Sequence, residues 1–515
     1  MKLVRLCLVA VTAVLLSSAV GRANVRLPEI ISNNMVLQKD IPLPIWGWAD
    51  AGEEVTVTLG ESTQTTKANG AGKWKVTLPA ITTAGGPHEM TVKGKNEIKI
   101  SNILVGEVWA GSGQSNMQWN VAQSTQGGEE VKNANFPKIR LFIIPLISAG
   151  TPSDSVNARW VECSPQTVAG SSAVLYFFGR EIHQKLDTPV GLITTAWGGT
   201  RIQPWIPPQG FTAIPELAGE RDQMLGMLDG YSESLANAAQ AIKARNAVIK
   251  AAQPGAELPP PVTVPGHPLN SNYNHTGLYN GMIHPIVPFG IKGFLWYQGE
   301  SNNGQGMHYY QMKRGLIEGW RTVWNQEGNR DFPFLFAQLA PYNYGPPRAT
   351  DLPGIWEAQT ATLQVKNTGM AVLTDIATVN DIHPPNKQEV GRRLSLWALA
   401  NTYGKSDLVY SGPLYQSLAV EGNKAIVSFE HAAGLKSRDG QELTWWSVAG
   451  ADKKFVKATA RIDGDKVVVT AEGVAEPVAV RFGWNQLAEP NFFNGAGLPA
   501  SPFRTDTWTD AVNVP

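Results

Sequence analysis

The stretch Val105-Gly-Glu-Val-Trp-Ala-Gly-Ser-Gly-Gln-Ser115-Asn-Met117 decides the fold class of this chain. Its first six residues have the character of a buried strand, and the glycine-rich turn behind them places a serine just beyond the strand's carboxyl end. Comparable apolar runs follow, separated by segments with helical periodicity: 139–144, 190–196, 293–297, 333–339 and 370–374. This alternation predicts an α/β domain in which helices cover both faces of a parallel sheet.

The regions on either side of this domain alternate with a period of two, which is typical of half-buried strands. The alternation runs from about 26 to 103 and returns between 425 and 482. We therefore predict three domains: an N-terminal β-sandwich at 24–103, the α/β domain at 104–404 and a C-terminal β domain at 405–515.

A helical insertion is expected inside the α/β domain at about 214–268. Apolar side chains recur on one helical face between 228 and 249, and a proline-rich linker follows. The insertion is either a packing element between domains or a lid over the substrate, and the pattern leaves both open.

The first 23 residues have the features of a secretory signal peptide. Lys2 and Arg5 precede an apolar run, and small residues occupy the two cleavage positions, Gly21 and Ala23. The run is shorter than the ~20 residues that a bilayer requires, so we expect no membrane span in the mature chain. The predicted location is secreted or periplasmic.

Composition excludes several kinds of protein. The chain has 515 residues, too many for one small module, and its 43% hydrophobic residues exclude a disordered chain. The 43 basic residues balance the 43 acidic ones, so no net field favours nucleic acid as a partner. The oligomeric state stays unknown at this stage.

Two polar turns supply a candidate nucleophile and base. Ser115 lies where an open parallel sheet exposes its ligands, although Met117 occupies the position at which an α/β-hydrolase elbow needs glycine. His383 lies in the loop between the last predicted strand and a helix. Asp381, two residues earlier in an extended segment, projects to the same side and can orient the imidazole, or it can simply cap the helix.

Two further turns follow predicted strands. Gln298-Gly-Glu300-Ser-Asn302 crowds amides and a carboxylate into one turn, and Trp197-Gly-Gly199-Thr-Arg201 frees backbone N–H groups to approach an oxyanion. Four polar turns at four strand ends indicate a single site.

The blocks 113–117, 197–200, 298–302 and 381–384 resemble those of the sialate O-acetylesterases, within the SGNH-hydrolase superfamily. That group is also similar to certain acetylxylan esterases. The resemblance spans nearly the whole mature chain, and it implies a three-layer α/β/α SGNH-hydrolase-like domain between the two β-sandwich-like domains. It also implies a serine esterase that hydrolyses O-acetyl esters of carbohydrates.

The resemblance assigns roles to particular residues. Ser115 would be the nucleophile and His383 the general base, and the expected oxyanion donors are the amide of Ser115, an amide of Gly198 or Gly199, and a side-chain amide of Gln298 or Asn302. The acid is open, because the Asp-x-x-His spacing that is usual in the superfamily is shortened here to Asp381-x-His383. Asp381 is the first choice and Glu300 the substitute or helper. The residues expected to contact substrate are Gln114, Asn116, Trp197 and Arg201. This chemistry needs no metal and no cofactor.

Other functions remain as alternatives. One is an acetylxylan esterase, with sialic acid esters slightly favoured as substrate. Another is a non-catalytic carbohydrate-binding protein, in which pairs such as Trp445-Trp446 would stack on sugars rather than fill a core. The third is a glycosidase that uses Glu300 and Asp381 as paired carboxylates.

Overall fold

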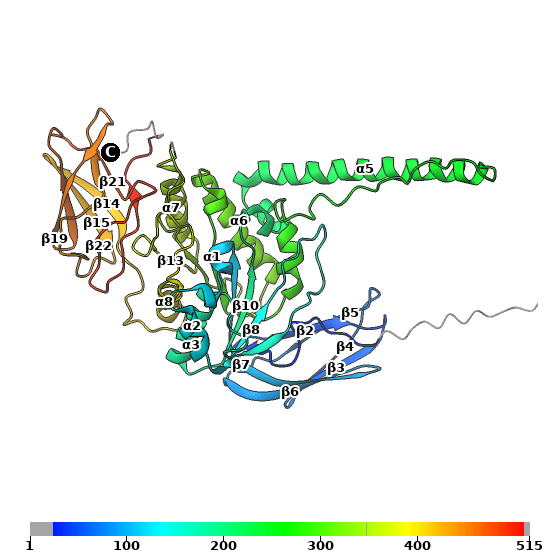
Figure 1. Ribbon diagram of the computed structural model, residues 1–515. Helices are drawn as coiled ribbons and strands as arrows, with labels where there is room; N and C mark the ends of the chain where they lie inside the picture. Colours follow the sequence, from blue (N-terminus) through cyan, green and yellow to red (C-terminus); the bar gives the residue numbers. More distant parts are fainter. Residues whose placement is uncertain (1–23, 347, 509–515) are drawn as a thin grey trace, which may run out of the picture.

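The computed structural model describes residues 24–346 and 348–508, which form three regions (Figure 1). The N-terminal strands lie at one end, a sheet with helices lies in the centre, and the C-terminal strands lie at the other end. The predicted signal peptide, 1–23, falls outside the described residues. No helix within them is long and apolar enough to cross a bilayer.

The central sheet has the strand order β13-β12-β11-β7-β10-β8-β9. Its strands are β7 (Glu97–Gly113), β8 (Phe136–Ile143), β9 (Trp160–Cys163), β10 (Val190–Ala196), β11 (Gly293–Tyr297), β12 (Phe334–Ala337) and β13 (Thr368–Ala371). All neighbours are parallel except β8 and β9. The α/β class is confirmed, but the sheet is mixed rather than purely parallel. The connection between β8 and β9 contains no helix, and a parallel return normally needs a long, usually helical crossover.

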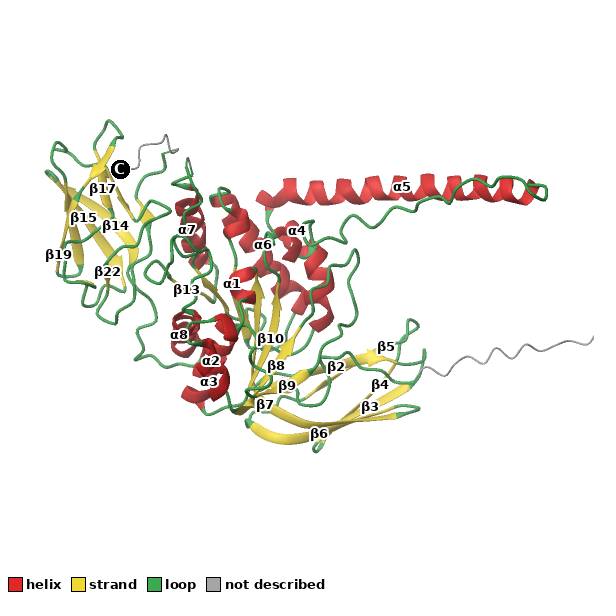
Figure 2. Ribbon diagram, viewed as in Figure 1, coloured by secondary structure: helices red, strands yellow, loops and turns green. Residues whose placement is uncertain are grey.

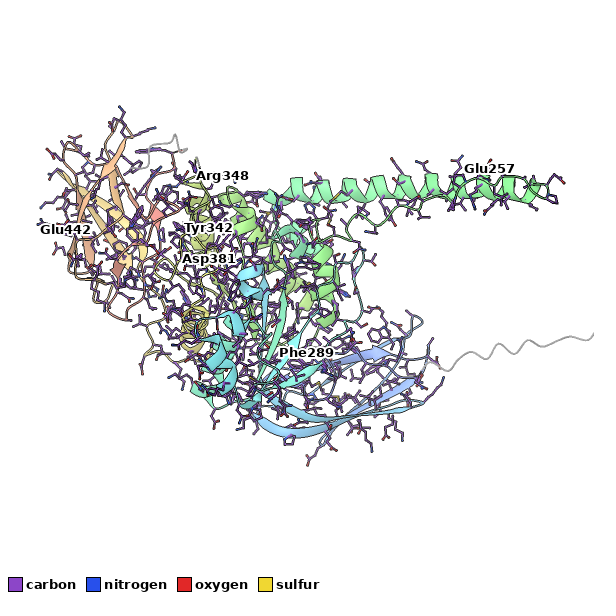
Figure 3. The ribbon with its side chains drawn as sticks, in the orientation of Figure 1. Glu257, Phe289, Tyr342, Arg348, Asp381 and Glu442 are labelled. Atoms are coloured by element: carbon purple, nitrogen blue, oxygen red, sulfur yellow. The ribbon has the colours of Figure 1, made fainter. Side chains whose placement is uncertain are left out.

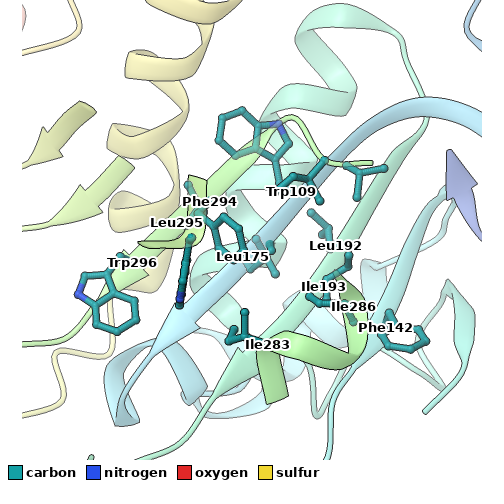
Figure 4. Packing of buried hydrophobic residues seen from close by; sticks show 14 of the residues in the cluster. Trp109, Phe142, Leu175, Leu192, Ile193, Ile283, Ile286, Phe294, Leu295 and Trp296 are labelled. Carbon is teal, nitrogen blue, oxygen red and sulfur yellow. The ribbon is translucent and has the colours of Figure 1, made fainter. Parts of the chain in front are cut away.

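The helices of the central region are α1 (Ser115–Gln118), α2 (Gly127–Asn133), α3 (Ala173–Leu186), α4 (Pro208–Ala213), α5 (Ala218–Ala251), α6 (Met307–Trp324), α7 (Asp351–Ala361) and α8 (Lys387–Trp397). They pack on both faces of the sheet. Trp109 of β7 contacts Phe178 of α3, with ring centroids 4.8 Å apart. The next residue, Ala110, pairs with Phe294, whose ring lies 4.5 Å from that of Trp320 in α6. Successive strand side chains point to opposite faces, so α3 and α6 lie on opposite sides of the core shown in Figure 4.

Strand β7 belongs to two regions at once. Its first half pairs with β6 (Gly85–Lys93), and its second half pairs with β10 and β11. The boundary predicted at 103/104 therefore falls inside one continuous strand, and a single hydrophobic core extends across it. The remaining N-terminal strands are β1 (Val36–Gln38), β2 (Leu43–Trp48), β3 (Glu54–Leu59), β4 (Ser62–Lys67) and β5 (Lys73–Leu78).

The C-terminal region is a β-sandwich with its own core. One sheet contains β14 (Leu414–Glu421), β15 (Lys424–Glu430), β20 (Lys466–Thr470) and β19 (Thr459–Asp463). The other contains β18 (Phe455–Lys457), β17 (Trp446–Ala449), β21 (Ala479–Phe482) and β23 (Phe503–Arg504), and a separate short pair is formed by β16 (Lys436–Ser437) and β22 (Phe492–Phe493). Val427 and Val469 of the first sheet share the core with Trp446 and Val480 of the second, which is how two half-buried sheets cover each other.

Helix α5 lies within the predicted insertion and extends from the central region as a long arm (Figure 2). The chain returns along it: the ring of Tyr231 lies 4.9 Å from that of His267, and Arg245 Nε donates to the carbonyl oxygens of Pro259 and Pro260 at 3.0 and 2.8 Å. Its apolar face therefore packs on its own proline-rich return segment.

Candidate active site

Three of the predicted turns meet at one edge of the central sheet. Strands β11, β7 and β10 are parallel neighbours, and Gly113 at the end of β7 pairs with both Tyr297 at the end of β11 and Ala196 at the end of β10. The chain leaves all three strands at the same level. The turns that follow therefore begin side by side: 114–118, 197–200 and 298–302.

The turn before Ser115 depends on Gly113. Gly113 has φ +137°, and a Cβ there would lie 2.2 Å from the carbonyl oxygen of Tyr297, so only glycine fits. Ser115 is then the first residue of α1 and is half-buried. Its hydroxyl is thus held at the junction of strand and helix.

The loop before α8 brings His383 to Ser115. His383 Nε2 lies 2.8 Å from Ser115 Oγ, and the indole of Trp119 stacks on the imidazole with 20° between the ring planes. Burial lowers the pKa of His383 below its ordinary value of 6.5, the positive charge of Lys387 lowers it further, and Asp381 opposes them. At neutral pH the ring is therefore uncharged and can accept the hydroxyl proton at Nε2.

The two candidate acids lie in different places. Asp381 Oδ1 lies 3.7 Å from His383 Nδ1 and accepts the backbone N–H of His383 at 2.9 Å. The Asp381 side chain is 55% exposed, and Figure 3 labels it at the centre of the molecule. Glu300 is buried, and its Oε1 accepts from the Asn116 amide at 2.6 Å. Among the residues that the structure describes, only Asp381 places a carboxylate within 4 Å of the imidazole.

A group of buried polar side chains connects the turn of Ser115 to the loop of His383. Asn116 Nδ2 donates to Glu300 Oε1 and, at 2.9 Å, to the carbonyl oxygen of Ile382, while Asn116 Oδ1 accepts from Lys387 Nζ. One amide thereby ties the turn that carries Ser115 to the loop that carries His383. Burial lowers the pKa of Lys387 to about 7 and raises that of Glu300, and each opposes the other's shift through their attraction.

The sequence did not predict Lys387 as a residue of the site. The only local signal is a lysine in the first turn of an amphipathic helix, close behind the His383 loop, and such a residue normally faces solvent. Only packing shows that its ammonium is buried beside Asn116.

Two backbone N–H groups are available for an oxyanion. Those of Ser115 and Gly199 donate to no atom of the described chain, and Gly199 has φ +74°. The Gly198 N–H, in contrast, donates to Gln118 Oε1 at 2.7 Å. Gly198 still lies against Ser115, because a Cβ there would be 3.3 Å from Ser115 Cβ.

The two candidate side-chain donors lie in a buried network. Gln298 Nε2 donates to Asn302 Oδ1 at 2.7 Å and, more weakly, to Gln114 Oε1 and the Thr200 carbonyl at 3.2 Å each. Asn302 Nδ2 donates to Gln203 and Gln305. The amide protons of Gln298 and Asn302 thus have protein acceptors, and the network holds the turns after β7, β10 and β11 against one another.

The four residues expected to touch substrate divide into two groups. Gln114 and Asn116 are buried and bonded within the protein. Trp197 is half-buried and Arg201 is exposed, on the same turn as Gly199, and Arg201 makes no ion pair with any described residue. Only the second pair can reach a ligand in solution.

Comparison with known proteins finds relatives that cover most of the chain. No family model matches the sequence. A sialate O-acetylesterase from Rattus norvegicus is 30% identical, covering 93% of this chain and 94% of that protein, and one from Homo sapiens is 29% identical, covering 93% and 92%. The crystal structure of a carbohydrate acetylesterase from Xanthomonas citri is 34% identical with a TM-score of 0.79, covering 94% of this chain and 100% of that one.

The fold, the Ser115–His383 contact and these likenesses define the class of the protein, which is a carboxylic ester hydrolase. The relatives from Rattus norvegicus and Homo sapiens are both sialate O-acetylesterases. The chain belongs to the sialate O-acetylesterase family.

Proposed function

We propose that this protein hydrolyses O-acetyl esters of carbohydrates through an acetyl-serine intermediate. The observation that carries the proposal is the 2.8 Å contact between Ser115 Oγ and His383 Nε2, at the edge where three parallel strands end. A nucleophile and a base within hydrogen-bond reach are the minimum that acyl transfer requires.

In the first step, His383 accepts the Ser115 proton as Oγ attacks the acetyl carbonyl carbon. The carbonyl oxygen becomes an oxyanion, which the Ser115 and Gly199 N–H groups stabilise. The carbon–oxygen bond to the sugar breaks, and His383 returns the proton to the leaving alcohol. Water then attacks the acetyl-serine by the same route and releases acetate.

Asp381 is the acid that stabilises the protonated imidazole in this proposal, because its carboxylate is the one near Nδ1. Glu300 acts indirectly. Together with Lys387 it holds the Asn116 amide, and this amide connects the turn that carries Ser115 to the loop that carries His383. We therefore propose that Asp381 acts directly on the imidazole, whereas Glu300 holds the backbone and side chains around it in place.

The rival functions account for less of the site. A glycosidase with Glu300 and Asp381 as its pair would need Glu300 at the rim, but Glu300 is buried and bonded to Asn116. A protein that only binds carbohydrate gives no reason for the Ser115–His383 contact.

O-acetylated sialic acid is the substrate that we favour over acetylated xylan. Support comes from the names of the relatives and from Arg201, whose exposed guanidinium beside the Gly199 turn suits a carboxylate. We also propose that the central region is a three-layer SGNH-hydrolase domain and that residues 1–23 direct the protein to the periplasm or the exterior.

The test is acetate release, measured side by side on O-acetylated sialic acid and acetylated xylo-oligosaccharide. Ser115→Ala should lower the rate on the preferred substrate by at least ~10⁴, and Ser234→Ala, on the exposed arm, should leave it unchanged. Undiminished acetate release by Ser115→Ala would overturn the mechanism, and a strong preference for the xylan fragment would overturn the choice of substrate.

A further inference from the structure

The C-terminal β-sandwich contains a groove that the proposed ester hydrolysis does not use. It has a volume of about 580 Å³, within the range of ligand pockets. It opens where β17, β18 and β19 approach the turn after β21, and small residues such as Ala458 and Ala460 line it. The larger side chains around it are Glu442, Trp445, Lys457, Glu472, Trp484 and Asn485.

Trp445 is the unusual residue of this groove. It is 39% exposed, and its backbone adopts φ +64°, a conformation that large side chains rarely occupy. Such strain persists only when the surroundings hold it in place.

The neighbours of Trp445 supply that restraint. The Thr444 N–H donates to the buried side chain of Asn491 at 3.0 Å, and the Trp445 carbonyl accepts from the Gly483 N–H at 2.9 Å. Asn491 in turn donates to the Glu442 carbonyl and to Asp439. The loop is thus fixed on both sides of a tryptophan that fills no core.

The surroundings of the indole combine apolar and polar surface. Trp446 and Trp484 also line the groove, but their side chains are buried and only 3% exposed, so Trp445 is the indole of the three that a ligand can reach. Glu442, Lys457 and Asn485 add donors and acceptors around them. Such a lining suits a pyranose ring, because a pyranose has a flat apolar face that can stack on an indole and hydroxyl groups at its edge that can form hydrogen bonds.

The charged side chains around the groove indicate whether its ligand is neutral or anionic. Glu442 and Glu472 place two carboxylates at the groove against the one ammonium of Lys457. An anionic sugar would meet net repulsion there, whereas a neutral one would not.

From these observations we infer that the Trp445 groove is a second, non-catalytic carbohydrate-binding site, and that it takes a neutral oligosaccharide. Figure 3 shows Glu442 of the groove well apart from Asp381 of the catalytic site, so a single sugar unit cannot occupy the groove and the catalytic site at once. The inference does not depend on the esterase proposal.

The experiment is calorimetric titration of the full chain with xylohexaose, cellohexaose and chitohexaose as neutral probes and with a sialic acid oligomer as the anionic probe. Trp445→Gly is the decisive variant, because glycine relieves the strain at φ +64° and should leave the melting temperature unchanged or raised. It should weaken binding of the neutral probe by at least about tenfold, and Trp445→Phe by less.

Two controls separate this site from the catalytic one. Ser115→Ala should bind the neutral probe as the wild type does. Val478 is an exposed apolar residue of the same domain outside the groove lining, so Val478→Ala should leave the affinity for the neutral probe unchanged. Hydrolysis of 4-nitrophenyl acetate should be equal in the wild type and in Trp445→Gly.

Four results would overturn the inference: no binding of any neutral probe, binding that Trp445→Gly leaves intact, tighter binding of the anionic probe, or loss of self-association in Trp445→Gly without loss of sugar binding. The last would make the groove a contact between copies of the chain.

Discussion

The indole of Trp119 stacks on the imidazole of His383, with ring centroids 4.8 Å apart and 20° between their planes. The stack covers one face of the imidazole that we propose as the general base, and the Trp119 N–H donates to the Gln123 carbonyl oxygen at 3.0 Å. Trp119, four residues after Ser115, thus contacts the side chain of His383, which is 268 positions away from Ser115 in the chain.

Loss of this stack should impair chemistry more than binding. Trp119→Ala frees the imidazole to rotate, and misplacement of a catalytic group by about 1 Å can cost ~10² in rate, so we expect kcat to fall by about that factor. Trp119→Phe should retain most of the activity because it keeps an aromatic face. Equal kcat for the alanine and phenylalanine variants would show that the stack does not position His383.

The pH dependence should reflect His383. Its neutral form is required, and burial holds its pKa below 6.5, so kcat/KM should be constant near neutrality and fall only when acidification passes that lowered pKa. The measurement is a pH–rate profile between pH 4 and 8. An acidic limb centred above the ordinary histidine value would contradict this assignment.

Substitution of Lys387 should shift the pH–rate profile. Its positive charge lowers the pKa of His383, so Lys387→Met should shift the acidic limb of kcat/KM to higher pH. The same change removes the donor to Asn116 Oδ1 and the positive charge near buried Glu300, so we also expect a loss of stability. The double variant Lys387→Met/Glu300→Gln should recover part of that stability. Lys405→Met, on the surface, is the control, and a Lys387→Met profile identical to the wild type would exclude electrostatic tuning.

The two acids can be separated by kinetics and stability together. Asp381→Asn should lower kcat by about 10² or more with little effect on the melting temperature, because its carboxylate is exposed and faces the imidazole. Glu300→Gln should mainly change stability, because its carboxylate is buried and bonded to Asn116. If Glu300→Gln suffers the larger loss of kcat at an unchanged melting temperature, Glu300 is the triad acid.

Replacement of Gly199 by any residue with a side chain should lower activity. Alanine at φ +74° strains the turn and displaces the N–H that we assign to the oxyanion, so Gly199→Ala should lower kcat by ~10² to 10³. Gly404→Ala is the matched control, because Gly404 has φ +68° with open space around its Cβ position and lies outside the site. Strain alone would affect the stability of both variants similarly, whereas only Gly199→Ala should lose turnover.

Much of the fold followed from local pattern. The apolar runs predicted the central strands, and parallel strands bring their carboxyl ends to one edge, which is why the four polar turns could be assigned to one site. The antiparallel edge strand β9 was missed, because its direction depends on the path of an irregular connection and not on the character of the strand itself.

The details of the site depend on where side chains point. Gln298 and Asn302 have the right chemistry for oxyanion donors, yet their amides bond to Gln114, Gln203 and other protein groups. The sequence pattern places Lys387 on the surface of a helix, but packing buries it against Asn116, next to Ser115 in the chain. Neither outcome can be obtained from residue type and spacing.

The sequence by itself determined the local elements: which runs form strands, where glycine permits a sharp turn, and which turns carry a hydroxyl, an imidazole or a carboxylate. These features depend on neighbouring residues alone. Tertiary structure decided that Ser115 and His383 are 2.8 Å apart, that Asp381 rather than Glu300 lies beside the imidazole, and that burial changes the charge balance around them. Distances and desolvation arise only when segments remote in the chain pack together, so they belong to the folded molecule.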